Sequence, residues 1–264
     1  MPDDLQPGWP EIIARIRRRT PARVLVDRAG AACRTTTQLE LREAHAAARD
    51  AVRTEFDLDR DLGKDFIESW RIFEVSTQAR SKDEYLLRPD LGRRLSESAI
   101  EKISAQCPKQ PLLQIVIGDG LSVTAVAAQV PQLMPLMVRG AEKLSGSINQ
   151  VAVGQPFVIR HCRVGVMNDI GELLRPEVLV LLIGERPGLA TADSLSAYMA
   201  FRPREGHTDA QRNLISNIHA RGVPVKQAAE RIINLAAQML REKKSGTELK
   251  ESLHLPKWLS SAES

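Results

Sequence analysis

The segment Val178–Ala190, with the sequence Val-Leu-Val-Leu-Leu-Ile-Gly-Glu-Arg-Pro-Gly-Leu-Ala, decides the fold class that we predict for this chain. An unbroken run of branched apolar residues leads into Gly184, and a Pro-Gly pair follows shortly after it. A run of this length with turn residues behind it is typical of a strand that is covered on both faces. We therefore predict a central strand of an α/β sheet.

The polar residues Glu185 and Arg186 follow directly at the carboxyl end of this predicted strand. In open α/β sheets, ligands bind outside the carboxyl ends of the strands. The two residues are therefore candidates for a ligand site. A polar turn with a surface ion pair between them is an equally good interpretation of this stretch alone.

Composition narrows the class of protein. Of the 264 residues, 43% are hydrophobic but only 4% are aromatic, so platforms that stack nucleic-acid bases are not expected. The 37 basic and 33 acidic residues give a formal charge of +4, which is too small to indicate a polyanionic partner. We expect no nucleic acid among the partners.

The cysteines and the apolar runs indicate the compartment. Cys33, Cys107 and Cys162 lie far apart without a C-x-x-C pair, which argues against both a disulfide framework and a zinc site. The N-terminus shows no apolar signal core, and no apolar run approaches the ~20 residues that span a bilayer. We expect a cytoplasmic protein with no metal site and no membrane contact.

A change of pattern near Pro108 divides the chain. Beyond it, strands and helices alternate, with strands predicted at 112–117 and 157–164 and a Gly-rich turn at Gly118–Ser122. We predict an α/β domain over residues 109–264 and a mainly helical N-terminal extension over residues 1–108.

The N-terminal extension contains two predicted helices, at 11–19 and 37–53, followed by a charged connector at 56–66. Arginines dominate the polar face of the first helix, which favours either a solvated surface or an acidic partner. Near the other end of the chain, we predict a strand at 194–201, a loop at 213–219 and a long amphipathic helix that begins at Pro224.

Motifs for catalysis are missing from the sequence. It contains no G-x-S-x-G, H-E-x-x-H or kinase set, and its Gly-rich turn lacks both the dinucleotide and the P-loop spacing. His161, His219 and Asp119 are the residues that could serve as an acid or a base, although a strand or loop histidine and a turn-forming aspartate explain them more simply. The pattern predicts a binding edge without catalytic residues.

Five segments of this chain occur, in the same order, in the small subunit of ethanolamine ammonia-lyase, and the chain resembles that family from about Thr20 to Ser245. They are Leu86–Leu95, Gly118–Ser122, Ile183–Leu189, Ser194–Tyr198 and Ile215–His219.

The resemblance implies an adenosylcobalamin-dependent enzyme that converts ethanolamine to acetaldehyde and ammonia. It implies that the radical chemistry takes place in a separate large subunit, which forms a hetero-oligomer with this chain. It also implies a Rossmann-like cobalamin-binding module that covers the cofactor at the subunit interface, with the N-terminal extension in contact with the large subunit. The chain lacks the D-x-H-x-x-G segment of other cobalamin modules, in agreement with a family that keeps the cofactor's own base on cobalt.

The family pattern places cofactor contacts on Val164, Glu185 and Leu214. Family members often have a cysteine at the position of Leu214, so this contact carries over if the backbone makes it and fails if sulfur is needed. Further candidates of lower rank are the four polar residues Asp119, Ser122, Arg186 and Asn217.

Two alternatives come from other classes of protein. One is a self-sufficient α/β enzyme that uses Asp119 or His161, and the other is a non-catalytic docking module that binds through its basic N-terminal segment. The sequence leaves open how many subunits assemble and whether the complex is enclosed in a bacterial microcompartment.

Overall fold

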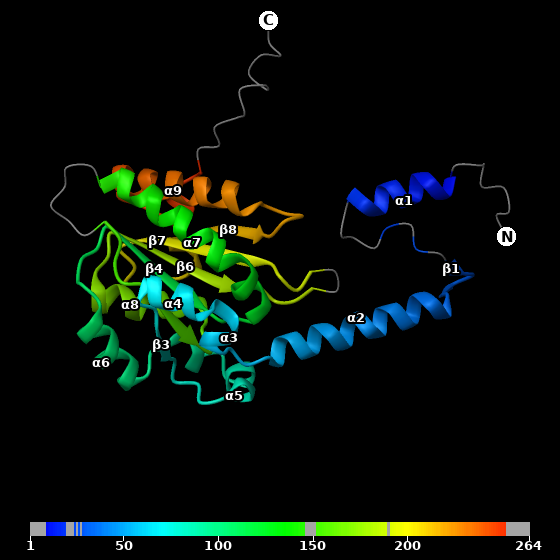
Figure 1. Ribbon diagram of the computed structural model, residues 1–264, viewed down its shortest axis with the longest axis horizontal. Helices are drawn as coiled ribbons and strands as arrows, with labels where there is room; N and C mark the ends of the chain where they lie inside the picture. Colours follow the sequence, from blue (N-terminus) through cyan, green and yellow to red (C-terminus); the bar gives the residue numbers. More distant parts are fainter. Residues whose placement is uncertain are drawn as a thin grey trace, which may run out of the picture.

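The computed structural model describes residues 9–19, 24, 26, 28–145, 152–188 and 191–251. A six-stranded sheet lies between two layers of helices, and two N-terminal helices extend away from this body (Figure 1). Residues 1–8 and 252–264, at the two ends of the chain, lie outside the described residues.

The sheet has the strand order β3-β5-β4-β6-β7-β8. Its strands are β3 (Phe73–Ser76), β4 (Leu113–Gly118), β5 (Phe157–Arg160), β6 (Val178–Gly184), β7 (Leu195–Phe201) and β8 (Asn213–Ile218). All seven residues of β6 are buried, and the strand lies between β4 and β7, which confirms the predicted central strand.

Strands β3, β5, β4 and β6 are parallel, whereas β7 and β8 are added in antiparallel pairs. The α/β class is therefore correct, but the sheet is mixed rather than wholly parallel. The reason is the short connection between β6 and β7: a parallel crossover needs a dozen or more residues, usually including a helix. Ten residues separate Gly184 from Leu195, so the chain turns back beside β6.

The sheet continues across the boundary that we expected near Pro108. Strand β3 comes from the N-terminal side of this position and pairs in parallel with β5 from the other side. Phe73 and Val75 of β3 are buried in the same cluster as Phe157 of β5. The α/β body therefore begins well before residue 109.

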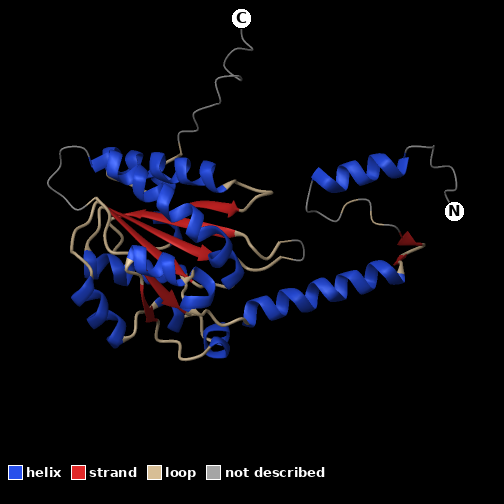
Figure 2. Cartoon of the chain, viewed as in Figure 1, coloured by secondary structure: helices blue, strands red, loops and turns tan. Residues whose placement is uncertain are grey.

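Helices cover both faces of the sheet (Figures 1 and 2). One cluster of buried side chains involves α3 (Leu58–Leu62), α7 (Val123–Ser145) and α9 (Val225–Glu242), with α4 (Lys64–Trp70) packed against it. The other cluster involves α6 (Glu97–Gln106) and α8 (Met167–Leu174). The segment 56–66, which we expected to be a charged connector, is instead largely helical. Its residues Phe56 and Leu62 are buried in the first cluster.

Shorter elements join these layers. They are α5 (Lys82–Leu87) and the 3-10 turns η1 (Leu91–Arg93), η2 (Val164–Val166), η3 (Asp209–Gln211) and η4 (Gly246–Glu248). None of the described helices is long and apolar enough to cross a membrane.

The N-terminal region contains α1 (Trp9–Arg19), a two-stranded hairpin of β1 (Arg28–Ala29) and β2 (Ala32–Cys33), and α2 (Thr35–Arg53). These helices agree with the predicted ones. No residue of α2 is buried, and Leu39 on it is 58% exposed. Figure 1 shows α2 leaving the body in a direction of its own, so this helix presents its surface outside the α/β domain.

Candidate functional site

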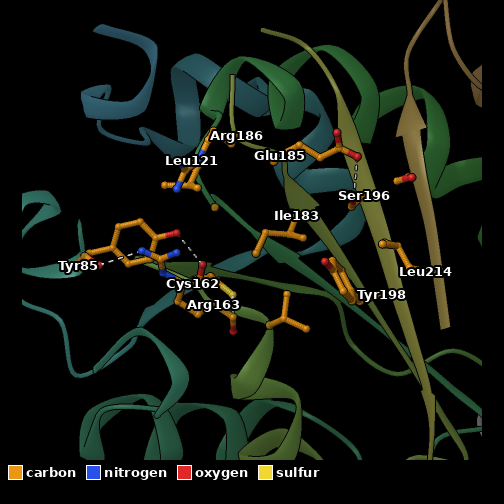
Figure 3. Close-up of a pocket in the computed structure, with 14 residues that line it drawn as sticks. Tyr85, Leu121, Cys162, Arg163, Ile183, Glu185, Arg186, Ser196, Tyr198 and Leu214 are labelled. Atoms are coloured by element: carbon orange, nitrogen blue, oxygen red, sulfur yellow. Dashed lines mark hydrogen bonds between the residues drawn. The ribbon is translucent and has the colours of Figure 1, made fainter. Parts of the chain in front are cut away.

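A cavity of about 370 Å³ lies at the carboxyl ends of β4, β5 and β6 (Figure 3). The loops that follow these strands supply most of its walls, and β7 and β8 close one side. This is the edge at which α/β sheets bind ligands, and here several elements that are distant in the sequence bring side chains into one cavity.

All three predicted contact residues, Val164, Glu185 and Leu214, line this cavity. Strand β5 ends at Arg160, earlier than we predicted, because the next residue, His161, has a positive φ of 55°. Val164 therefore lies not in the strand but at the start of η2. Leu214 lies on β8, opposite Tyr198 on β7, and is 46% exposed.

The expected loop at 213–219 is therefore mostly a strand. Its apolar residues do not alternate regularly in the sequence. In the structure, the pairing of β8 with β7 shifts its register between Leu195 and Ala197 of β7. An irregularity of this kind changes which side chains face the sheet, and β8 is also an edge strand with exposed residues. A strand with these two features does not need the regular alternation of apolar and polar residues from which a strand is predicted.

Glu185 is held by three hydrogen bonds from the neighbouring strands. Its Oε2 accepts from the Ser194 hydroxyl at 2.7 Å, and its Oε1 accepts from the Ser196 hydroxyl at 2.6 Å. The backbone N–H of Asn217 also donates to Oε1, at 2.9 Å. Among the described residues, Glu185 forms no ion pair with Arg186, so the surface ion pair that we considered is not formed.

Close backbone packing forms the base of the cavity. The N–H of Leu121 donates to the carbonyl of Gly184 at 3.1 Å, which joins the Gly-rich turn to the end of β6. A methyl group on Gly184 would collide with the carbonyl of Ser122, and Gly120 has a positive φ of 57°. These two glycines let the loops approach each other directly.

A buried ion pair lies beneath this turn. Asp119 is fully buried, and its carboxylate accepts from the backbone N–H groups of His161 at 3.0 Å and Cys162 at 2.8 Å. Lys82 of α5 is 5% exposed, and its Nζ lies 3.4 Å from Asp119 and 3.1 Å from the carbonyl oxygen of Gly120. The pair therefore fastens α5 to the two loops that follow β4 and β5.

Tyr85 and Arg163 form the wall opposite Glu185 (Figure 3). The Tyr85 hydroxyl donates to the carbonyl of Cys162 at 3.1 Å, and the Arg163 guanidinium lies 4.3 Å from the centre of the Tyr85 ring. Burial raises the pKa of Tyr85 far above its ordinary value and also raises the pKa of the Cys162 thiol. Both groups are therefore neutral at physiological pH.

The three residues considered for acid–base catalysis, Asp119, His161 and His219, do not have the access that this role requires. His219 is only 4% exposed. Asp119 has no exposed surface. His161 is 5% exposed, its Nδ1 faces the carbonyl of Ala79 at 3.0 Å, and its Nε2 faces Glu55 at 3.2 Å. A general base must reach the substrate proton, so the structure gives these residues positioning roles.

The lower-ranked candidates separate into two groups. Arg186 lines the cavity and is exposed, whereas Asn217 contributes its backbone to Glu185. Ser122 is buried: its hydroxyl donates to the carbonyl of Ala192 and accepts from the N–H of Ala125 near the start of α7. Ser122 is therefore a structural residue of the loop.

Sequence reasoning did not select Arg163, Ser196 or Tyr198, which also line the cavity. Ser196 and Tyr198 belong to one of the five ordered segments, so that segment was the available signal. Among the described residues, no group of three or more His, Cys, Asp or Glu side chains is arranged to hold a metal ion. The site combines apolar walls with a few polar groups, which suits binding and orientation of a ligand.

The salt bridges of Glu55 lead to a prediction about pH. Burial raises the pKa of Glu55, but its hydrogen bonds and charge interactions with Arg160 and His161 outweigh this, so the net pKa lies below the ordinary 4.5. Stability from this group is therefore present above pH 4.5 and is lost as the pH falls through the lowered folded-state pKa. We expect Glu55→Gln to lower the free energy of unfolding at pH 7 by less than about 1 kcal/mol, because the side chain is partly exposed.

Urea unfolding from pH 3 to 7 measures this effect, with Glu40→Gln on exposed α2 as the matched control. The difference between wild type and Glu55→Gln should vanish at the acidic end. A difference that stays constant over the whole range would contradict the ion-pair explanation.

Comparison with known proteins decides the family. The family model described as ethanolamine ammonia-lyase light chain matches residues 10–250, which is most of the chain. The chain belongs to the ethanolamine ammonia-lyase light chain family. The match covers α2, the whole sheet and every residue that lines the cavity.

Relatives in this light chain family are similar over nearly the same length. The ethanolamine ammonia-lyase small subunit of Clostridium perfringens is 41% identical over 92% of this chain and 79% of its own length. The corresponding subunit of Clostridium acetobutylicum is 40% identical over 91% of this chain and 95% of its own. That of Fusobacterium nucleatum is 39% identical over 91% of this chain and 78% of its own.

Proposed function

We propose that this chain is the small subunit of an adenosylcobalamin-dependent ethanolamine ammonia-lyase and that the cavity binds one side of the cofactor. The observation that carries the proposal is the meeting of Val164, Glu185 and Leu214 in a single hollow at the carboxyl edge of the sheet. These residues lie on three separate segments of the chain, and the sequence alone related them only through the family resemblance.

The chemistry of the cavity fits a corrinoid. A corrinoid is broad and fringed with amide groups, so it needs apolar contact together with a few acceptors and donors. Val164, Ile183 and Leu121 supply apolar surface. Glu185 accepts three hydrogen bonds, which leaves part of its acceptor capacity for an amide or hydroxyl of the cofactor.

Donors are also available in the wall. The Tyr198 hydroxyl makes no hydrogen bond within the described part of the chain, and burial, followed by the nearby charge of Asp209, raises its pKa. It is therefore a neutral donor at physiological pH. A cavity of about 370 Å³ encloses only part of a corrinoid, which supports a cofactor that is shared between two subunits.

The residues of this chain would bind and orient the cofactor and exclude water from one side of it. When bound, adenosylcobalamin supplies the radical chemistry by which ethanolamine becomes acetaldehyde and ammonia, and catalytic residues are expected on the large subunit. Closure of the pocket by a second chain would keep the reactive bond in a dry environment.

The exposed N-terminal helix α2 supports a second part of the proposal, namely that this region contacts the large subunit. A helix that fully buries none of its side chains gains little from its own hydrogen bonds, so most of its stability must come from packing. A partner chain along α2 would supply that packing. A cytoplasmic location, and enclosure in a bacterial microcompartment, remain predictions.

Reconstitution tests the proposed function. The purified chain alone should show no ammonia-lyase activity, and addition of the large subunit together with adenosylcobalamin should produce acetaldehyde and ammonia from ethanolamine. The large subunit without this chain serves as the control and should stay inactive. Robust activity of this chain by itself would overturn the subunit proposal in favour of a self-sufficient enzyme, and an inactive, unassembled mixture would favour the docking module.

A further inference from the structure

A second cavity, of about 450 Å³, lies beside the first. The two share Arg163, Val164 and Tyr198 in their walls, and Figure 3 shows Arg163 and Tyr198 at the side of the first cavity. None of the cofactor contacts that the family resemblance implied extends beyond Val164 into this second space. A ligand held in the first cavity could therefore reach into the second across the side chains that separate them.

Positive charge dominates the lining of the second cavity, which includes four arginines and two carboxylates. Arg94 pairs with Asp169 at 2.8 Å, and Arg212 pairs with Asp209 at 2.6 Å. Within the described part of the chain, Arg93 and Arg163 have no carboxylate partner. The cavity thus has basic groups that its own acidic residues do not neutralise.

Arg212 is the most constrained of these groups. Its side chain is only 6% exposed, its terminal nitrogens are held by Asp209 and by Asn168 at 3.0 Å, and its Nε has no partner among the described residues. The Nε of Arg163 is also buried without a partner. A buried guanidinium with an unused donor is costly unless an acceptor is supplied from elsewhere.

His207 contributes a polar but uncharged group. Burial, followed by the nearby charges of Arg204 and Arg212, lowers its pKa, and its buried Nδ1 has no hydrogen-bond partner among the described residues. The lining therefore offers fixed guanidinium charges and a neutral imidazole. This set of groups suits a compact oxyanion, because guanidinium donors match the spacing of phosphate oxygens.

We propose that the second cavity binds a phosphate group and, resting on the proposed function, that this group is the phosphodiester of the cofactor's nucleotide loop. Cobalamin carries one such phosphodiester, between the corrin side chain and the nucleotide base. A corrinoid bound against Val164 would have the basic cavity directly on the other side of that residue. The surplus charge of Arg93 and Arg163 would neutralise the phosphodiester, and Arg212 would give the lining a rigid positive charge.

Two corrinoids that differ in the phosphate test this proposal in the assembled complex with the large subunit. Adenosylcobalamin has the nucleotide loop, whereas adenosylcobinamide lacks both the phosphate and the base. We expect Arg93→Gln and Arg212→Gln each to weaken adenosylcobalamin binding about tenfold, as the loss of one charge-assisted hydrogen bond would. Adenosylcobinamide binding should stay within about twofold of wild type, because the interaction lost is absent from that ligand.

Arg93→Gln keeps the test interpretable if Arg212→Gln impairs folding, because Arg93 is exposed. Arg139→Gln, at an exposed position of α7, removes the same charge outside both cavities and should affect neither corrinoid. Equal losses for the two corrinoids, or no loss for either, would overturn the proposal.

Titration of the isolated full chain with inorganic phosphate, followed by NMR, separates the possible sources of the phosphate. Shifts at Arg212 and His207 that disappear in Arg93→Gln would support the anion site. If these shifts occur while the variants bind both corrinoids normally, the cavity binds a free phosphate and the assignment to the cofactor is wrong. If wild-type complex binds neither corrinoid, the proposed function fails, and the phosphate titration still decides whether the anion site exists.

Discussion

Asp119→Ala is expected to lower the free energy of unfolding by about 3–5 kcal/mol, the cost of removing one partner from a buried ion pair. The substitution leaves the ammonium of Lys82 buried without its carboxylate, since both side chains are almost completely inaccessible. It also removes the acceptor of two backbone N–H groups, those of His161 and Cys162. Urea unfolding of the isolated chain measures the loss.

The exposed pair of Asp90 and Arg88 offers a matched control, because its carboxylate makes a comparable ion pair in solvent. Asp90→Ala should leave the free energy of unfolding nearly unchanged, because solvent screens an exposed ion pair. Lys82→Met in the Asp119→Ala background should recover part of the loss, because the buried positive charge is removed as well. Equal effects of Asp119→Ala and Asp90→Ala would contradict the role of burial.

Glu185→Ala is expected to weaken adenosylcobalamin binding to the assembled complex by about 10- to 100-fold, which corresponds to roughly 1.4–3 kcal/mol. The substitution removes an acceptor from the wall of the cavity. It also leaves the hydroxyls of Ser194 and Ser196 and the N–H of Asn217 without their partner. Some loss of stability, of about 1–3 kcal/mol, should accompany the loss of binding.

Glu185→Gln separates these two effects. Glutamine keeps an oxygen for two of the donors, so the fold should be nearly retained while the negative charge is lost. Cofactor titration of the complex and urea unfolding of the isolated chain give the two readouts, with Glu68→Ala at an exposed position of α4 as the control. Cobalamin affinity that is unchanged in Glu185→Ala would show that this residue only supports the strands.

The hydrogen bonds of Glu185 show which features of this position the sequence could predict and which it could not. The apolar run before Gly184 and the Pro-Gly turn after it are local features, so they predicted where the strand ends. The partners of Glu185 lie 9, 11 and 32 positions further along the chain. Only the antiparallel addition of β7 and β8 brings them to the carboxylate.

Long-range pairing accounts for the other corrections. Strand β3 was assigned to the N-terminal extension because its own residues do not show that β5, more than 80 residues away, is its neighbour. The same holds for Lys82 and Asp119, which are 37 positions apart and which no spacing rule connects. Charges at such distances become a buried pair only after the helix and the loops have packed.

By itself the sequence determined the local features: the buried strand at 178–184, the amphipathic helices and the ordered segments that identify the family. These follow from periodicity and turn chemistry, which act over a few residues. The tertiary structure alone decided that the sheet is mixed and that Glu185 accepts hydrogen bonds from distant residues. It also decided that Arg93, Arg163 and Arg212, from three separate segments, line one basic cavity. The reason is physical: strand pairing, burial and charge neutralisation depend on which distant segments meet, and a linear pattern does not contain that information.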